Sequence, residues 1–136
     1  MHDDKKRTLA DYRLARAKEL INDAVTLLDA GSYRSANNRA YYAIFYAMRA
    51  ILAMDETDFK KHSGVIQYFQ REYVKTGIFD TVYSDIIMDA SEIRNASDYD
   101  DFYLASREEA SSQIDGAVKF TEAVENYIAD ITEPGQ

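Results

Sequence analysis

The sequence contains no cysteine, and this absence removes several classes of chemistry. Its 136 residues offer no thiolate nucleophile, no disulfide framework and no cysteine-ligated metal site. Only two histidines are present, His2 and His62, so a metal site built from several histidines of one chain is not expected. We therefore expect neither a metal ion nor a cofactor.

Proline and glycine are also scarce, and this favours long uninterrupted helices. The single proline, Pro134, lies near the end of the sequence, and only five glycines occur. No apolar run approaches the roughly 20 residues of a membrane span, and no signal-peptide pattern opens the chain. We expect a cytoplasmic protein with one domain over residues 1–136, a core over about residues 8–131 and short disordered termini.

Apolar residues recur at helical spacing, which predicts an all-α bundle. The expected helices cover residues 8–30, 33–54 and 62–77, a segment that begins after Asp80, and a last segment that begins near Ser106. Gly31 is expected to end the first helix, and Ser32 to cap the second. Ser106 and Glu109 form a capping-box pattern for the last helix.

The last two expected helices each carry a stripe of residues that would face the core. In the fourth helix this stripe consists of Val82, Ile86, Ala90, Ile93 and Ser97. In the fifth helix it consists of Ala110, Ala117, Thr121, Val124 and Ile128. The sequence therefore predicts one core shared by all the helices.

Acidic side chains outnumber basic ones, and their distribution is uneven. The formal net charge is -8, yet residues 1–75 carry 13 Lys and Arg against 10 Asp and Glu, while residues 76–136 carry 3 against 14. The negative net charge argues against nucleic-acid binding, because phosphate binding is driven by cationic side chains. The asymmetry indicates one basic and one acidic side, and the acidic side could dock a basic partner. A solvated acidic surface that aids solubility is the simpler interpretation.

The second expected helix is apolar around most of its circumference. Its core stripe consists of Tyr33, Ala36, Ala40, Ile44, Ala47 and Ile51. The opposite side should be polar, but it also carries large aromatic residues beside Asn38. Such a helix is either central in its own fold or covered by a partner. Because tyrosine and arginine are typical of interfaces, we predict a homodimer interface at Tyr42, Phe45, Tyr46 and Arg49.

Arg94 lies beside the expected buried line of the fourth helix. Asp98 follows one turn later on the same flank, so the two side chains can form an ion pair. Asn95 and Asp98 would then hold the guanidinium so that its remaining donors face a ligand. A guanidinium matches two oxygens of a phosphate at once. The alternative is an ion pair that only ties the fourth helix to its neighbour.

His62 follows Lys60 and Lys61 at an expected helix start, where anions are favoured. Alternatively, it is a first-turn residue that packs against the apolar stripe of residues 65–69. Three acidic residues in the preceding connection are expected to be solvated: Asp55, Glu56 and Asp58.

Four short segments follow one another in a characteristic order: Asn38-Arg39-Ala40-Tyr41-Tyr42-Ala43, His62-Ser63-Gly64-Val65, Phe69 through Gly77, and Arg94-Asn95-Ala96-Ser97-Asp98-Tyr99-Asp100. This order resembles the HEPN superfamily of small prokaryotic helical domains. The resemblance runs from about Leu9 to Ile128. It implies a four- or five-helix up-and-down bundle that dimerises, with a polar cleft at the dimer seam. Candidate RNA- or nucleotide-binding residues are Asn95, Arg39, Tyr42 and His62.

Many members of this superfamily are toxins, namely metal-independent endoribonucleases paired with a minimal nucleotidyltransferase as antitoxin. Their nuclease motif is an arginine, a polar residue, three to five further residues and a histidine. Arg94 and Asn95 match its beginning, but the histidine is absent, and its permitted positions hold Tyr99, Asp100 and Asp101. The resemblance implies Arg94, Asp98 and Tyr99 as catalytic candidates. It also makes Tyr99 the position where some nucleotidyltransferases attach nucleotides.

Three functional interpretations remain open from the sequence. The first is a HEPN toxin that acts on RNA and is restrained by a nucleotidyltransferase. The second is a non-catalytic HEPN module that binds a nucleotide or RNA, or that serves as partner subunit of a nucleotidyltransferase. The third is a purely structural helical dimer. Cleavage through a 2′-hydroxyl needs a base, and tyrosine, with an ordinary pKa of about 10, is a weak one at neutral pH. The sequence therefore supports phosphate binding better than proton transfer.

Overall fold

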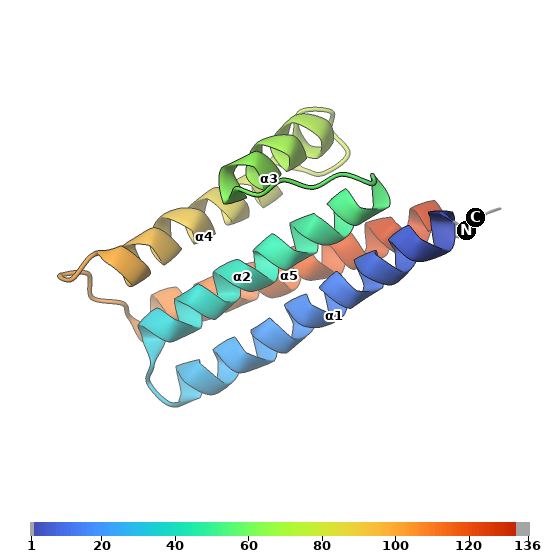
Figure 1. Cartoon of the computed structure of the whole chain (residues 1–136). Coiled ribbons are helices and arrows are strands. Elements are labelled where there is room, and N and C mark those ends of the chain that lie inside the picture. The colour runs from blue at the N-terminus through green and yellow to red at the C-terminus, as the bar shows by residue number, and fades with distance from the viewer. Residues whose placement is uncertain (1, 133–136) are drawn as a thin grey trace.

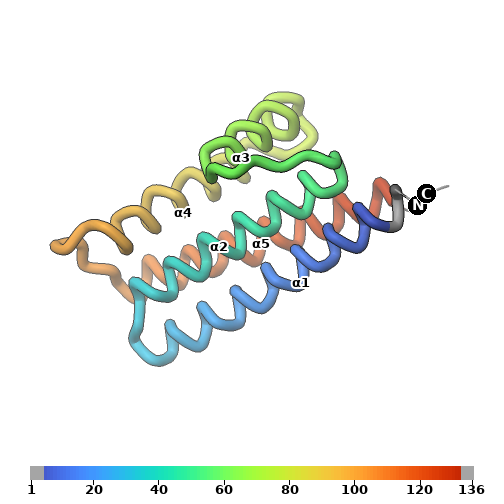
Figure 2. The backbone as a smooth tube through the Cα atoms, in the orientation of Figure 1, coloured from blue at the N-terminus to red at the C-terminus, as the bar shows by residue number. Residues whose placement is uncertain are grey.

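The computed structural model describes residues 2–132, with side chains from residue 5 onward. Its elements are α1 (His2–Asp29), α2 (Tyr33–Met54), α3 (His62–Phe69), a π-helical turn η1 (Gln70–Val74), α4 (Thr81–Tyr99) and α5 (Arg107–Thr132). The four long helices run alternately up and down, and both termini lie at one end of the bundle (Figures 1 and 2). The short α3 and η1 lie over one end of α2. The predicted all-α up-and-down bundle is confirmed.

Helix α2 lies at the centre of the bundle and packs against α1, α3, α4 and α5. Its alanines allow this because a small side chain lets a neighbouring helix approach closely. Of its expected core stripe, Tyr33 is half-buried and the other five residues are buried. Phe45 on the opposite side is only 7% exposed, so α2 is enclosed by its own fold there. Tyr42, Tyr46 and Arg49 are half-buried, and the homodimer interface stays a prediction.

The buried line of α4 differs from the predicted one. Ile87, Ala90 and Ser97 are buried, whereas Ile86 and Ile93 are only half-buried. The spacing of the buried line places Arg94 on it, rather than beside it. Of the five predicted residues, Ala90 and Ser97 are buried as expected, whereas Val82, Ile86 and Ile93 are half-buried where α4 packs against α2 and α5. The predicted stripe of α5 is confirmed, since all five residues are buried.

The predicted helix boundaries are partly confirmed. Gly31 follows α1 with φ of +80°, a left-handed conformation that favours glycine. Ser32 holds the N-cap position of α2, but its side chain makes no capping hydrogen bond, so that prediction was wrong. The Ser106 hydroxyl does accept a hydrogen bond from the Glu109 backbone N–H at 3.0 Å. The expected third helix is divided into α3 and η1, and Gly77 follows with φ of +84°.

Helix α1 begins at His2, six residues earlier than the sequence predicted. The Arg7 guanidinium bonds Asp11 within α1 and the Thr132 hydroxyl at the end of α5, which ties the two helices together. Residues 2–7, which the sequence assigned to a disordered terminus, belong to α1, while residue 1 and residues 133–136 lie outside the described residues. Between residues 2 and 132, no helix combines the length and the apolar character required to cross a bilayer.

The corrected buried line of α4 can be tested with a pair of neighbouring substitutions. Ile87 is 1% exposed, whereas Met88 is 51% exposed. We expect Ile87→Ala to lower the free energy of unfolding by about 2–5 kcal/mol, because it leaves a cavity in the core. Met88→Ala, the control, should change it by no more than about 0.5 kcal/mol. Urea unfolding measures both, and equal effects would contradict the assigned face.

Candidate functional site

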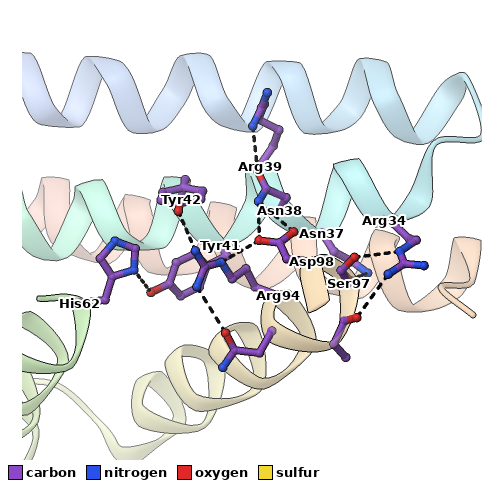
Figure 3. Close-up of polar contacts among 12 residues, drawn as sticks. Arg34, Asn37, Asn38, Arg39, Tyr41, Tyr42, His62, Arg94, Ser97 and Asp98 are labelled. Atoms are coloured by element: carbon purple, nitrogen blue, oxygen red, sulfur yellow. Dashed lines mark hydrogen bonds and ion pairs between the residues drawn. The ribbon is translucent and has the colours of Figure 1, made fainter. Parts of the chain in front are cut away.

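The C-terminal end of α4 is fixed to α2 by side chains that replace missing helix hydrogen bonds. The last carbonyl groups of a helix have no partner within it. Arg34 of α2 donates to the carbonyl oxygens of Ser97 and Asp100, each at 2.8 Å (Figure 3). The buried Asn37 amide lies 3.2 Å from the Ser97 hydroxyl. These contacts set the position of the segment that carries Arg94.

Arg94 is held by three neighbours. Its Nη2 donates to the Tyr42 hydroxyl at 2.8 Å, and its Nη1 donates to Asn95 Oδ1 at 3.3 Å. Its Nε lies 3.0 Å from Asp98 Oδ2 in an ion pair without hydrogen-bond geometry. The predicted contacts of Arg94 with Asn95 and Asp98 are therefore present. Its side chain is 16% exposed, and each terminal nitrogen keeps one N–H without a partner among the described residues.

Three tyrosine rings surround the same guanidinium. Its carbon Cζ lies 5.1, 5.4 and 5.8 Å from the ring centroids of Tyr41, Tyr42 and Tyr99. Such cation–π contacts stabilise the charged form. Burial opposes the charge of Arg94, but its contacts with Tyr42, Tyr41 and Asp98 outweigh burial and raise its pKa. Tyr99 is 74% exposed and forms the outer rim of this cluster.

Asp98 connects Arg94 to two further polar residues of α2. Both of its carboxylate oxygens accept from the Asn38 amide, at 3.1 and 3.2 Å. The Asn38 carbonyl oxygen in turn accepts from Arg39 at 2.7 Å. A pocket of 430 Å³ lies along this side of the bundle, lined by Arg34, Ser35, Asn38, Arg39, Ser97 and Asp98. The predicted binding residue Arg39 therefore joins the Arg94 site through Asn38 and Asp98.

His62 reaches the same site from α3. Its Nδ1 lies 3.0 Å from the Tyr41 hydroxyl, and its ring centroid lies 4.2 Å from that of Phe45. Its ring therefore contacts aromatic residues of α2. The sequence had offered packing against residues 65–69 and did not predict these contacts with α2. Burial, together with the positive charges of Arg94 and Arg49, lowers the pKa of His62 below its ordinary value of 6.5. The imidazole is therefore neutral at pH 7.

A second pocket, of 520 Å³, opens beside His62. It is lined by Tyr42, Phe45, Tyr46, Arg49, Asp58, Phe59, Lys60 and His62. This lining includes all four residues that the sequence assigned to a dimer interface. The site residues predicted from three separate segments thus lie along one side of α2.

The acidic residues before α3 are paired, contrary to the expectation that they are solvated. Asp58 accepts hydrogen bonds from both Arg13 and Arg49. Burial alone would raise the pKa of Asp58, but these arginines and the Phe59 backbone N–H outweigh burial and lower it. Asp55 accepts from the hydroxyl groups of two tyrosines, Tyr68 and Tyr73. One carboxylate between two guanidiniums leaves this end of the pocket with an excess of positive charge.

Several residues of the site were missed by the sequence analysis. Arg34 and Asn37 were not singled out, because a polar residue on a helix is usually solvated. Arg13 is only 8% exposed, although the helical pattern of α1 gives no sign of its partners. The only sign of a role for Tyr41 in the sequence was its position in the tyrosine-rich segment of the second helix. Its central position between Arg94 and His62 depends on how α3 and α4 pack.

The fold and the site define a class: a small all-α bundle whose central helix carries tyrosines and whose fourth helix presents an enclosed arginine. The HEPN domain family model matches residues 10–127, which is most of the chain. The chain belongs to the HEPN family.

Comparison with curated proteins identifies several relatives. A UPF0332 protein of Thermotoga maritima is 35% identical over 128 residues, covering 94% of this chain and 97% of the relative. Two proteins of Methanocaldococcus jannaschii carry the names "Putative toxin MJ0142" and "Putative toxin MJ0605". They are 30% and 34% identical over 115 residues, covering 85% of this chain and 78% and 85% of the relatives. The chain is thus similar to proteins named as toxins.

The lowered pKa of His62 predicts a specific pH dependence of stability. The unfolded chain binds a proton at His62 near pH 6.5, while the folded chain resists it to lower pH. The contribution of the neutral His62 to the free energy of unfolding is therefore complete above pH 6.5. It is lost as the pH falls below 6.5 and through the pKa of His62 in the folded chain. Between pH 7.5 and pH 5.5, about one unit either side of 6.5, we expect the wild type to lose more free energy of unfolding than His62→Gln.

Urea unfolding at both pH values measures this difference. His2→Gln, which removes the other histidine of the chain, is the control and should follow the wild type. The same loss in His62→Gln as in the wild type would contradict the account of His62.

Proposed function

We propose that this HEPN protein is the toxin component of a toxin–antitoxin pair and that it acts on RNA. The observation that carries the proposal is the geometry of Arg94, whose guanidinium is oriented by Tyr42, Asn95 and Asp98. The similarity to relatives named as toxins supports the same proposal. The substrate is a single-stranded segment of RNA, and the reaction is cleavage of its backbone without a metal ion.

Arg94 binds the phosphate that is attacked. Its two free N–H groups lie on different terminal nitrogens, which is the arrangement that contacts two oxygens of one phosphate. A fixed cation also stabilises the extra negative charge that develops on that phosphate during attack by the 2′-hydroxyl. Enclosure by tyrosine rings strengthens this effect, because it leaves the Arg94 side chain only 16% exposed to water.

Asp98 and Tyr99 have different roles in this proposal. Asp98 is already engaged by Arg94 and Asn38, so it positions the guanidinium and does not transfer protons. Tyr99 is exposed at the rim and presents a ring on which an unstacked base can lie. Asn95 and Arg39 extend the polar surface on either side of Arg94, where neighbouring phosphates would pass.

The partners follow from the same proposal. A minimal nucleotidyltransferase serves as antitoxin, and a second copy of the chain contributes a symmetric site across Tyr42, Phe45, Tyr46 and Arg49. Two copies would place two arginine clusters along one RNA strand, which gives RNA a local positive surface although each chain has a net charge of -8.

A second candidate function is a non-catalytic HEPN module that binds RNA or a nucleotide. Positions 99–101 hold no histidine, and Asp98 is occupied by Arg94 and Asn38. The contacts that orient Arg94 fit RNA binding without cleavage equally well. In that case, RNA binding depends on Arg94 but no RNA is cleaved.

The test is RNA cleavage by purified protein in EDTA. We expect the wild type to cleave a single-stranded RNA, and Arg94→Ala to lower the rate by about 10²–10³-fold, the effect of removing a charge-stabilising donor. Arg107→Ala is the matched control, because Arg107 is an exposed arginine at the start of α5 and its loss changes the net charge equally. Arg94→Lys should also be impaired, because it keeps the charge but loses the two-pronged geometry.

Growth arrest in cells that express each variant alone gives a second readout. Cleavage or toxicity that is unchanged in Arg94→Ala would contradict the proposed function. Binding of RNA by the wild type without cleavage, together with loss of binding in Arg94→Ala, would favour the non-catalytic module.

A further inference from the structure

Two apolar side chains in the loop between α4 and α5 lie almost fully in solvent. Phe102 is 93% exposed and Leu104 is 90% exposed, more than any other large apolar side chain among the described residues. Single apolar residues at a surface are ordinary, but two large ones in one short loop form a patch that a partner can cover. We call Phe102 and Leu104 the loop patch.

Hydrogen bonds fix the loop with its patch in solvent. The Phe102 backbone N–H donates to Asp100 Oδ1 at 3.0 Å, and the Tyr103 backbone N–H donates to the Asp100 carbonyl oxygen at 3.2 Å. Arg34 of α2 donates to the same carbonyl oxygen at 2.8 Å. Tyr103 is half-buried, whereas the patch residues on either side of it are exposed. The loop therefore presents two apolar anchors that need little further ordering when a partner binds.

Acidic residues flank the loop patch. Asp100 and Asp101 precede it and Glu108 follows it, and all three are exposed. Arg107 is the only cation between residues 100 and 108. This charge disfavours the phosphates of RNA and favours a protein surface in which cations surround an apolar hollow.

The same chain carries such a surface between the start of α1 and the end of α2. A pocket of 430 Å³, which we call the α1–α2 pocket, is lined by Lys5, Lys6, Leu9, Arg13, Ala53, Glu56, Thr57 and Asp58. Leu9 is 42% exposed, and Lys5 is an exposed cation. Asp58 is shared by Arg13 and Arg49, so the surroundings of the pocket have an excess of positive charge. The pocket includes none of the four residues assigned to the homodimer interface.

The loop patch and the α1–α2 pocket lie at opposite ends of the bundle. The loop between α4 and α5 is at the end where α1 connects to α2, whereas the start of α1 and the end of α2 are at the other end (Figures 1 and 2). A chain therefore cannot fill its own pocket with its own loop. Two copies placed in line bring the loop of one to the pocket of the next.

We infer that the loop patch of one copy inserts into the α1–α2 pocket of a second copy, so that the chains associate head to tail. Phe102 and Leu104 are the apolar anchors, and the acidic residues beside them meet the cations around the pocket. Because two different surfaces meet, the contact repeats from copy to copy until a ring closes or a filament forms. It is separate from the predicted dimer interface on α2, and it does not depend on the proposed function.

Sedimentation velocity over about 1 μM to about 1 mM protein tests this association. We expect wild-type species larger than a dimer to increase with concentration and to decrease with added salt, which screens the charges. The double variant Phe102→Ser, Leu104→Ser should lower the association constant about tenfold or more, because it loses both anchors. Met88→Ser is the matched control, because Met88 is 51% exposed on α4, outside the loop, and its loss should leave association unchanged.

The absence of cysteine allows a second test, of which surfaces meet. Leu104→Cys and Leu9→Cys are purified separately, mixed and oxidised. We expect disulfides that join one copy of each variant, formed faster than disulfides between copies of the same variant. Met88→Cys mixed with Leu9→Cys is the control and should form mixed disulfides only at the background rate. None of these three residues belongs to the buried core, so the variants should fold.

The outcomes also identify other occupants of the loop patch. A wild type that never exceeds a dimer would overturn the inference and leave the patch to a different protein. Equal association in the double variant, or mixed disulfides of Leu104→Cys at the control rate, would overturn it as well. Unchanged association with loss of binding to 2′-O-methyl RNA, which cannot be cleaved, would assign the patch to RNA. That result would overturn the inference and leave the proposed function standing.

Discussion

The central position of α2 is the constraint on which the rest of the structure depends. A helix enclosed by four others needs hydrogen-bond partners for most of the polar side chains that it buries. Small alanines bring α1 and α5 close, while Asn37 and Tyr41 need partners from the third and fourth helices. Ser97 of α4 and His62 of α3 supply them. The same contacts that allow polar groups in the core therefore determine where α3 and α4 lie.

The candidate site is a consequence of that arrangement. Because Arg34 binds the last carbonyl groups of α4, the Arg94 side chain is directed over the tyrosines of α2. Its positive charge is stabilised there by Tyr42 and Asp98, and it opposes a second positive charge on His62. Enclosure thus yields a fixed cation on α4 and a neutral imidazole on α3, both in contact with the tyrosines of α2.

The fold was largely predictable from the sequence, because helical spacing and terminating glycines depend on local structure. The stripe of α5 and the role of Gly31 are examples. The stripe of α4 was right at Ala90 and Ser97 but named Ile86 where Ile87 is buried, since both isoleucines are equally apolar and only packing distinguishes them. Arg94 and Asp98 were found because they lie four residues apart on one helix. Arg34 contacts Ser97, which lies 63 residues later in the sequence, and Tyr41 contacts His62, which lies 21 residues later. No local sequence pattern encodes such contacts.

The coupling of Arg94 to His62 across the tyrosine pair is the central claim, and the pKa of His62 measures it directly. An NMR titration of the imidazole carbon-bound proton gives this pKa in the wild type, Arg94→Met and Arg107→Met. If the two groups form one site, Arg94→Met raises the pKa of His62 towards its ordinary value, and Arg107→Met leaves it unchanged. An unchanged pKa in Arg94→Met, with the fold intact, would contradict the account.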